Sequence, residues 1–185
     1  MGNREDLLAG AKRCLLTRGY ARTSVRDIAT EAGVSMAAIG YHYGSREALL
    51  TKAVVELMDE WGDGFGRRLA ADPGPSDPYG RFEHYWTTVI ESFREQRVVW
   101  AATMDAAVQA EHVPELRKEI ADGLQDGRMG LAHLLAGASE EDAQAVGSFY
   151  QALFSGVMMQ WVVDPSRAPS AADLARALRV IVDSM

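Results

Sequence analysis

Hydroxyl, aromatic and basic side chains lie close together in the first quarter of the chain, where they could contact the phosphates of a nucleic acid. Thr23 and Ser24 offer hydroxyl and backbone N–H groups, and Arg26 offers a guanidinium group. Tyr41 offers a phenolic hydroxyl, and Arg46 lies at the expected start of a helix, where the helix dipole also attracts anions. We expect these groups to bind the DNA backbone and to set the register of the protein on it.

A face of small side chains lies among these phosphate-binding groups. A rotation of about 100° per residue puts Ile39 on the inner side of a short helix. The opposite side carries Met36, Ala37, Gly40 and Tyr41. An exposed helix face usually carries Lys and Glu, whereas small side chains let a helix backbone sink into the major groove of DNA. The pattern therefore predicts that Met36, Ala37 and Gly40 face the bases.

Two short helices and a tight turn must hold this face in place. Ser24 and Asp27 have the order of a capping box, and Gly33 can end the helix that they begin in a left-handed conformation. Ala29 is small enough for a close crossing with the next helix, which Ser35 can cap. This combination of caps, small residues and a glycine turn is typical of a helix-turn-helix.

Apolar residues recur at spacings of three and four along the chain, and no segment alternates like a strand. The sequence therefore predicts an all-α fold of about nine helices, four of them within about the first 65 residues. Residues 72–78 contain three of the six prolines and separate these helices from the rest. Five more helices are expected near residues 79–95, 97–111, 114–136, 139–163 and 170–184.

Charge is distributed unevenly over the 185 residues. Residues 1–52 carry a net charge of +3 and the remainder carries −10, so a phosphate partner is expected for the N-terminal part alone. The single cysteine, Cys14, excludes an internal disulfide and fits a reducing compartment. Because the chain has no apolar run of 18 residues and no signal-peptide pattern, we expect a cytoplasmic protein without a membrane partner.

The stretch TSVRDIATEAGVSMAAIGYHYGSREALL resembles the DNA-binding domain of the TetR family of bacterial transcription regulators. The resemblance covers about a quarter of the chain. It implies an all-α homodimer whose larger C-terminal domain dimerises and binds a small effector. It also adds His42 to the phosphate-contacting residues, while Gly40 stands where many members have a tyrosine. The predicted DNA-binding residues are Thr23, Ser24, Arg26, Ser35, Met36, Ala37, Gly40, Tyr41, His42 and Arg46.

These patterns predict a sequence-specific DNA-binding transcriptional regulator. A three-helix helix-turn-helix domain over residues 1–52, with the start of the fourth helix, would bind DNA, and residues 53–185 would bind the effector and dimerise. The resemblance implies a repressor that a small, mainly apolar or aromatic effector releases from a palindromic operator. The alternatives are a nonspecific DNA-binding protein and an all-α enzyme acting on an apolar ligand. His84, His112 and His133 are isolated, so we expect no metal, no cofactor and no catalytic residue.

Apolar stripes in the C-terminal part have two explanations. The first is an effector cavity, lined by Trp86, Ile90, Phe93, Trp100, Met104, Phe149, Leu153 and Met158. The second is ordinary core packing, which the same spacing usually reflects. The last two helices are expected to form the dimer interface, although their apolar faces could also pack within one subunit. The predicted interface residues are Gly147, Phe154, Gly156, Leu174, Leu178 and Ile181.

Three glycines, Gly62, Gly64 and Gly66, lie close together in the expected fourth helix. Each glycine weakens a helix by about 1 kcal/mol relative to alanine. We therefore expect the fourth helix to end or to flex at this point. The spacing differs from that of a nucleotide-binding loop, and no strand precedes it.

Overall fold

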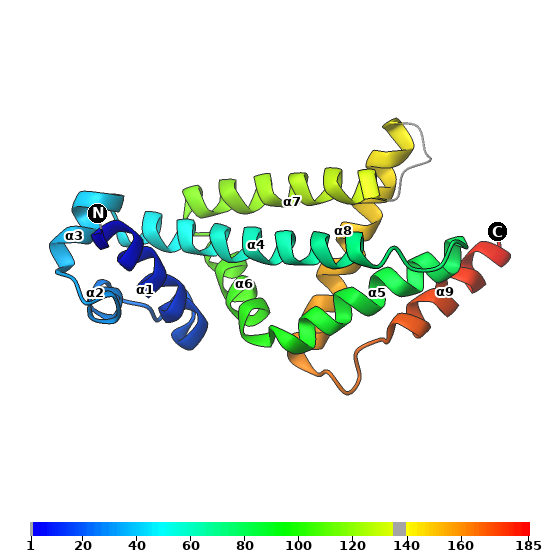
Figure 1. Ribbon diagram of the computed structural model, residues 1–185, viewed down its shortest axis with the longest axis horizontal. Helices are drawn as coiled ribbons and strands as arrows, with labels where there is room; N and C mark the ends of the chain where they lie inside the picture. Colours follow the sequence, from blue (N-terminus) through cyan, green and yellow to red (C-terminus); the bar gives the residue numbers. More distant parts are fainter. Residues whose placement is uncertain (1, 135–139) are drawn as a thin grey trace.

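The computed structural model describes residues 2–134 and 140–185, which form nine helices and no strand (Figure 1). The predicted all-α fold of about nine helices is confirmed. None of these helices is long and apolar enough to cross a membrane. In chain order they are α1 (Gly2–Arg18), α2 (Val25–Ala32), α3 (Met36–Tyr43), α4 (Arg46–Ala71), α5 (Pro78–Glu95), α6 (Arg97–Gln109), α7 (Pro114–Leu134), α8 (Glu140–Val163) and α9 (Ala171–Asp183).

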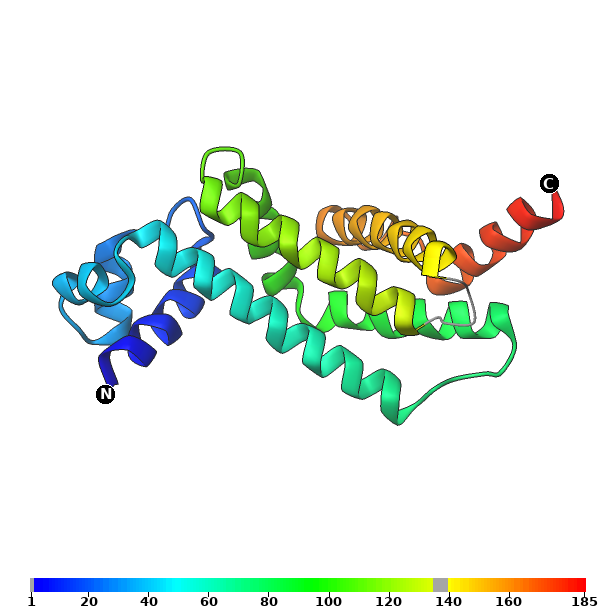
Figure 2. The same cartoon turned by 90° about the horizontal axis from the view of Figure 1, so that it is seen from above.

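The long helix α4 joins two groups of helices (Figures 1 and 2). Helices α1, α2 and α3 surround its N-terminal end, and the remaining helices lie along the rest of the molecule. Helix α7 packs beside α4 and against α8, while α5 packs against α9. The predicted domain boundary at residues 52–53 therefore falls inside α4.

Local capping signals explain where several helices begin and end. The Ser24 hydroxyl accepts a hydrogen bond from the Asp27 N–H, and the Asp27 carboxylate accepts one from the Ser24 N–H, so the predicted capping box is confirmed. Gly33 follows α2 with a φ of +68°, a conformation that glycine adopts without strain. Ser45 caps α4 through its hydroxyl. Ser35 is the N-cap residue of α3 as predicted, but its side chain makes no capping hydrogen bond.

Helix α4 is continuous from Arg46 to Ala71 and passes through the glycine-rich segment 62–66. The predicted end of the helix at these glycines is therefore wrong, whereas flexing at the same place stays a prediction. The loop expected around the prolines is confirmed, since α4 ends at Ala71 and α5 starts at Pro78. The ends expected for the helices near 114–136 and 139–163 fall partly outside the described residues.

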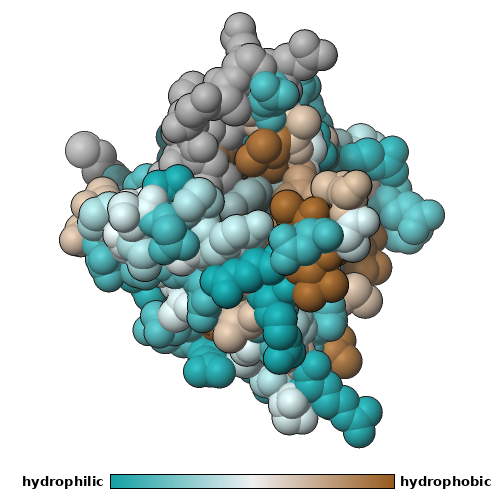
Figure 3. All heavy atoms as spheres, turned by 90° about the vertical axis from the view of Figure 1, so that its right-hand side faces the viewer, coloured by the Kyte–Doolittle hydropathy of each residue, from teal (hydrophilic) through white to brown (hydrophobic). Residues whose placement is uncertain are grey.

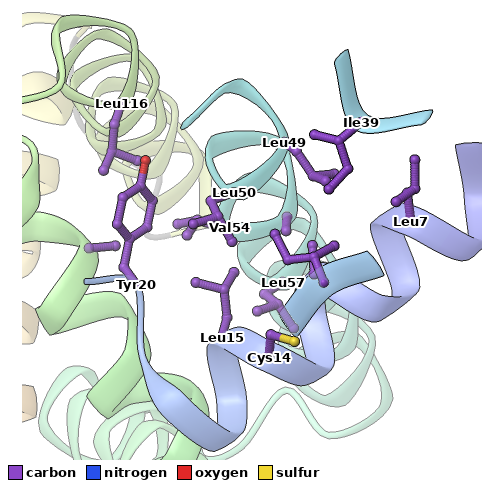
Figure 4. Close-up of a cluster of buried hydrophobic side chains, with 14 of the residues drawn as sticks. Leu7, Cys14, Leu15, Tyr20, Ile39, Leu49, Leu50, Val54, Leu57 and Leu116 are labelled. Atoms are coloured by element: carbon purple, nitrogen blue, oxygen red, sulfur yellow. The ribbon is translucent and has the colours of Figure 1, made fainter. Parts of the chain in front are cut away.

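A buried cluster of aliphatic side chains fixes α1, α2 and α3 on α4 (Figure 4). Ile39 of α3 points toward Leu49 of α4, and Leu116 of α7 joins the same cluster from the C-terminal part. Gly10 lets α1 approach α2 closely, because a Cβ atom there would lie 3.0 Å from the Ala32 Cβ. The helix-turn-helix is thus attached to a rigid support.

A second buried cluster, rich in aromatic side chains, holds the C-terminal helices together. Trp86 and Trp100 are completely or almost completely buried, and the Trp100 Nε1 donates a hydrogen bond to the Ser92 carbonyl oxygen (3.2 Å). Phe93 and Phe154 contact Trp100 edge-on, with ring centroids 5.2 and 5.4 Å away. Edge-to-face pairs of this kind add to the stability that burial provides.

Candidate DNA-binding face and ligand cavity

The outer face of α3 carries the side chains that the sequence predicts to face DNA. Tyr41 is 86% exposed and Met36 is 52% exposed. Ala37 and Gly40 are exposed as well, whereas Ile39 is buried on the opposite side. A Cβ atom at Gly40 would have no heavy atom within 4 Å, so the face is open at this position.

Further predicted DNA contacts lie at the start of α2 and at the two ends of α3. Ser24, Arg26 and Ser35 are exposed, and His42 is half-buried with its ring edge-on to the preceding tyrosine. The Ser24 hydroxyl donates to the Asp27 carboxylate (2.5 Å). This hydrogen bond and that of the Ser24 backbone N–H hold the pKa of Asp27 below its usual range, so the capping carboxylate stays ionised.

Thr23 does not fit its predicted role as a phosphate contact. Its side chain is buried, and its hydroxyl donates a hydrogen bond to the Gly19 carbonyl oxygen (2.7 Å). Its backbone N–H donates to the Tyr20 carbonyl oxygen (3.4 Å). This prediction is wrong because Thr23 closes the α1–α2 loop, residues 19–24, instead of facing solvent.

Arg46 also binds the α1–α2 loop, although the sequence predicts a direct phosphate contact. Its side chain is 20% exposed. Its Nη2 donates to the Tyr20 carbonyl oxygen (2.6 Å), and its Nε donates to the Thr23 carbonyl oxygen. The Nη1 pairs with the Glu47 carboxylate at 2.8 Å, and this hydrogen bond lowers the pKa of Glu47. Acceptors within the protein already bind the guanidinium group. The predicted phosphate contact is therefore corrected: in this structure Arg46 holds the α1–α2 loop.

Asp105 of α6 holds the other side of the α1–α2 loop. Its Oδ2 accepts hydrogen bonds from the backbone N–H groups of Tyr20 (2.5 Å) and Ala21 (3.2 Å). Gly19 has a φ of +82°, and a Cβ atom there would lie 2.7 Å from the same Oδ2. The sequence reasoning missed this residue, yet a signal exists, because Asp105 and Arg97 are the only charged residues of α6. The carboxylate connects α6 to the loop between α1 and α2.

A cavity of about 320 Å³ opens among α4, α5, α7 and α8. Aromatic side chains and glycines make up most of its wall, and no charged side chain of the described residues lines it. Burial raises the pKa of Tyr85, so its hydroxyl stays protonated at neutral pH. The lining residues are Trp61, Gly62, Phe65, Gly66, Leu69, Tyr85, Gly127, Gly130, Leu131, Gln151 and Phe154.

None of the side chains predicted to line an effector cavity lines this one. Trp86, Ile90, Phe93 and Trp100 are buried core residues, Met104, Leu153 and Met158 are half-buried, and Phe149 is exposed. The prediction is wrong because helical spacing identifies a buried face but not whether a side chain or a void lies against it. The missed signal is the glycines of α4 and α7, which remove side-chain volume from facing helices.

Several predicted dimer-interface residues lie inside the subunit. Gly147 is buried against the backbone of Arg128 in α7, where no Cβ atom would fit, and Phe154 lines the cavity. These two predictions are wrong, because both residues serve packing within one chain. Leu174 and Leu178 are half-buried against the aromatic cluster. Of the predicted residues, Gly156 and Ile181 are exposed.

An all-α chain with an exposed helix-turn-helix and a further helical part that contains a partly open cavity has the organisation of a transcription regulator. Residues 7–53 match the family model described as bacterial regulatory proteins of the tetR family. Residues 79–184 match the model described as the tetracyclin repressor-like C-terminal domain. The chain therefore belongs to the TetR family.

Individual relatives agree with this assignment. The HTH-type transcriptional regulator TtgR of Pseudomonas putida is 24% identical over 183 residues, which cover 94% of this chain and 86% of TtgR. EthR of Mycolicibacterium smegmatis is 35% identical over 72 residues, which cover 39% of this chain and 32% of EthR. The protein is thus a DNA-binding transcriptional regulator and not an enzyme.

Solved structures share the fold at low sequence identity. The putative transcriptional regulator SCO7518 from Streptomyces coelicolor A3(2) has a TM-score of 0.77 at 22% identity, with 98% of each chain covered. The multidrug binding protein EbrR, complexed with ethidium, has a TM-score of 0.73 at 22% identity, with 95% of each chain covered.

Among residues 2–134 and 140–185, no group of three or more His, Cys, Asp or Glu side chains could hold a metal ion.

Proposed function

We propose that the protein is a homodimeric repressor that binds a palindromic operator and leaves it when a small, mainly apolar or aromatic ligand enters the cavity. The observation that carries this proposal is the exposed face of α3. Met36, Ala37 and Gly40 would face base edges in the major groove, and the Tyr41 hydroxyl would reach a phosphate. The positive charge of residues 1–52 supports DNA binding at this end.

The remaining phosphate contacts in this proposal come from Ser24, Arg26, Ser35 and His42. Arg26 supports it best, because it is exposed and has no hydrogen bond or ion pair within the described part of the chain. Such contacts bind any DNA sequence and set the register, while the α3 face selects the site. Residues 1–52 would act as the DNA-binding domain and residues 53–185 as the ligand-binding and dimerisation domain, in the cytoplasm.

An uncharged stripe on α8 supports the dimer. Its exposed residues recur at the spacing of one helix face: Ala152, Ser155, Gly156, Met159, Gln160 and Val163. A Cβ atom at Gly156 would meet nothing within 4 Å, so a second helix could approach closely. Figure 3 shows hydrophobic side chains exposed at the end of the molecule where α9 lies. Two copies of α8 and α9 would form a four-helix bundle and hold two recognition helices about 34–36 Å apart.

Selection of bound fragments from random genomic DNA tests the proposed sequence specificity. The wild-type protein is expected to enrich a palindromic site. Ala37→Leu and Gly40→Met are expected to change the enriched sequence, because both side chains would meet base edges. Tyr41→Phe should weaken binding to all sequences alike, because it removes only a phosphate contact. Enrichment of no sequence would instead mean a nonspecific DNA-binding protein, and absence of DNA binding would refute the proposal.

Light scattering in solution tests the dimer. The wild-type protein is expected at twice the mass of one chain. Met159→Glu should give monomers with weaker operator binding, because it places a charge in the α8 stripe. Val108→Glu is the matched control, since Val108 is also an exposed apolar residue but lies on α6, away from the α8 stripe. A monomeric wild-type protein that still binds the palindrome tightly would contradict the dimer.

A further inference from the structure

We propose that the cavity selects an uncharged, compact and flat aromatic ligand and excludes a cation of the same shape. This inference rests on the proposed function, because it names the ligand class for the cavity assigned there. It follows from the shape of the lining, from its lack of charge and from the polar atoms that the lining offers.

The walls of the cavity fit a flat ring system. Trp61 and Phe65 lie nearly parallel, with ring centroids 5.0 Å apart and an interplanar angle of 18°. Tyr85 lies edge-on to Phe65 at 5.6 Å, and Phe154 lies 5.4 Å from Trp61. An aromatic guest can contact such rings face to face or edge to face, the two geometries that aromatic contacts favour.

Glycines of α4 and α7 leave parts of the cavity wall without side chains. A Cβ atom at Gly62, Gly66 or Gly130 would have no heavy atom within 4 Å, and all three glycines are exposed, so they border the part of the cavity that opens to solvent. The free volume of about 320 Å³ lies at the small end of the range for ligand cavities, about 300 to 1,000 Å³. A compact aromatic guest with few substituents fits such a space.

Among the described residues, the lining offers no ionic partner for a charge. Its described side chains include no carboxylate, amine, guanidinium or imidazole, and the amide among them belongs to Gln151. A cation that enters loses its hydration, and the aromatic faces replace only part of that loss. An uncharged guest avoids this cost altogether.

Two polar groups remain available to an uncharged guest. The Tyr85 hydroxyl makes no hydrogen bond within the described residues, and the Gln151 amide lies against Gly127, whose Cβ would be 3.0 Å from its Oε1. A buried donor without a partner is unfavourable, so a ligand with a ring nitrogen or carbonyl oxygen would gain by accepting from it. The preferred ligand therefore carries at least one uncharged acceptor.

Calorimetric titration with acridine and proflavin tests the charge selection. Both probes have the same three-ring skeleton and a ring nitrogen, but at pH 8 acridine is uncharged and proflavin is a cation. We expect acridine to bind at least about tenfold more tightly than proflavin. The full-length protein is used, and circular dichroism of each variant checks its fold.

Three variants connect this preference to the cavity. Gln151→Glu adds a carboxylate to the lining and should shift the acridine-to-proflavin ratio toward proflavin by at least about tenfold. Gln144→Glu is the matched control, because Gln144 is exposed on the same helix and lies outside the lining, and should leave the ratio unchanged. Gly66→Leu should remove binding of both probes, because the new side chain fills the open volume.

The inference is overturned if proflavin binds the wild-type protein as tightly as acridine does. It is also overturned if neither probe binds, or if folded Gly66→Leu binds both probes like the wild type. These results would leave DNA binding and site selection intact. Failure of the proposed function appears in a different measurement, as loss of sequence selection.

Discussion

Replacing Arg46 with alanine is expected to destabilise the α1–α2 loop, not to remove a phosphate contact. The change removes two short hydrogen bonds from a charged donor to the carbonyl oxygens of Tyr20 and Thr23, and a longer one (3.5 Å) to that of Ala21. Hydrogen bonds of charged groups contribute about 1.5–3 kcal/mol each, and the lower value applies because the side chain is 20% exposed. The ion pair with Glu47 is partly exposed and adds at most about 1 kcal/mol.

The expected loss is therefore about 3 kcal/mol of unfolding free energy, which corresponds to a melting temperature lower by about 6–12 °C for a chain of this length. Thermal melting followed by circular dichroism measures it. Arg46→Lys should fall between the wild type and Arg46→Ala, because lysine keeps the charge but lacks the planar fork that reaches two carbonyls.

Arg26→Ala is the matched control. Arg26 is exposed and makes no ion pair or hydrogen bond within residues 2–134 and 140–185. Its loss should leave the melting temperature unchanged within about 2 °C. It should reduce by about one the slope of log affinity against log salt concentration, measured by fluorescence anisotropy on duplex DNA.

Arg46→Ala should therefore lower the melting temperature, and Arg26→Ala should instead reduce the dependence of DNA affinity on salt concentration. If Arg46→Ala melts like the wild type and lowers the salt slope by about one, its guanidinium contacts DNA and the loop-holding role is refuted.

Three further expectations follow from the packing. Gly40→Ala should stabilise the protein by up to about 1 kcal/mol, because alanine has the higher helix propensity. Gly10→Ala should not show this gain, because its Cβ would lie 3.0 Å from that of Ala32. Chemical denaturation measures both variants, and equal gains in unfolding free energy would contradict the close packing at Gly10. Asp105→Ala should lower the unfolding free energy by about 1–3 kcal/mol, because it leaves two N–H groups of the α1–α2 loop unpaired. Asp105→Asn should lower it less in the same assay. An unchanged unfolding free energy would refute the contribution of Asp105 to stability. Burial raises the pKa of Tyr150 to about 12 from 10.0, so the folded state holds this proton longer than the unfolded state and stability falls as pH rises from about 10 to 12. Tyr150→Phe should remove that part of the alkaline loss in denaturation curves, and an unchanged curve would refute it.

Local signals made the DNA-binding end predictable. The capping box of Ser24 and Asp27 and the left-handed Gly33 depend on residues within a few positions of one another, so their pattern can be read without the fold. The exposed α3 face follows from helical periodicity once Ile39 is taken as buried, and Tyr41 and Met36 are exposed as expected. The length of α4 was harder to predict, because packing along it outweighs the poor propensity of three glycines.

The sequence by itself determined which residues cap the helices and which small side chains form the face of α3. Only the tertiary structure decided that Arg46 and Thr23 hold a loop, that Gly147 and Phe154 belong inside the subunit, and that the cavity lies beside α4 and not among the predicted tryptophans. The physical reason is distance along the chain. A cap or a helix face is set by neighbours in sequence, whereas Tyr20 meets Asp105 across 85 positions and a void exists only where distant helices fail to fill the space between them.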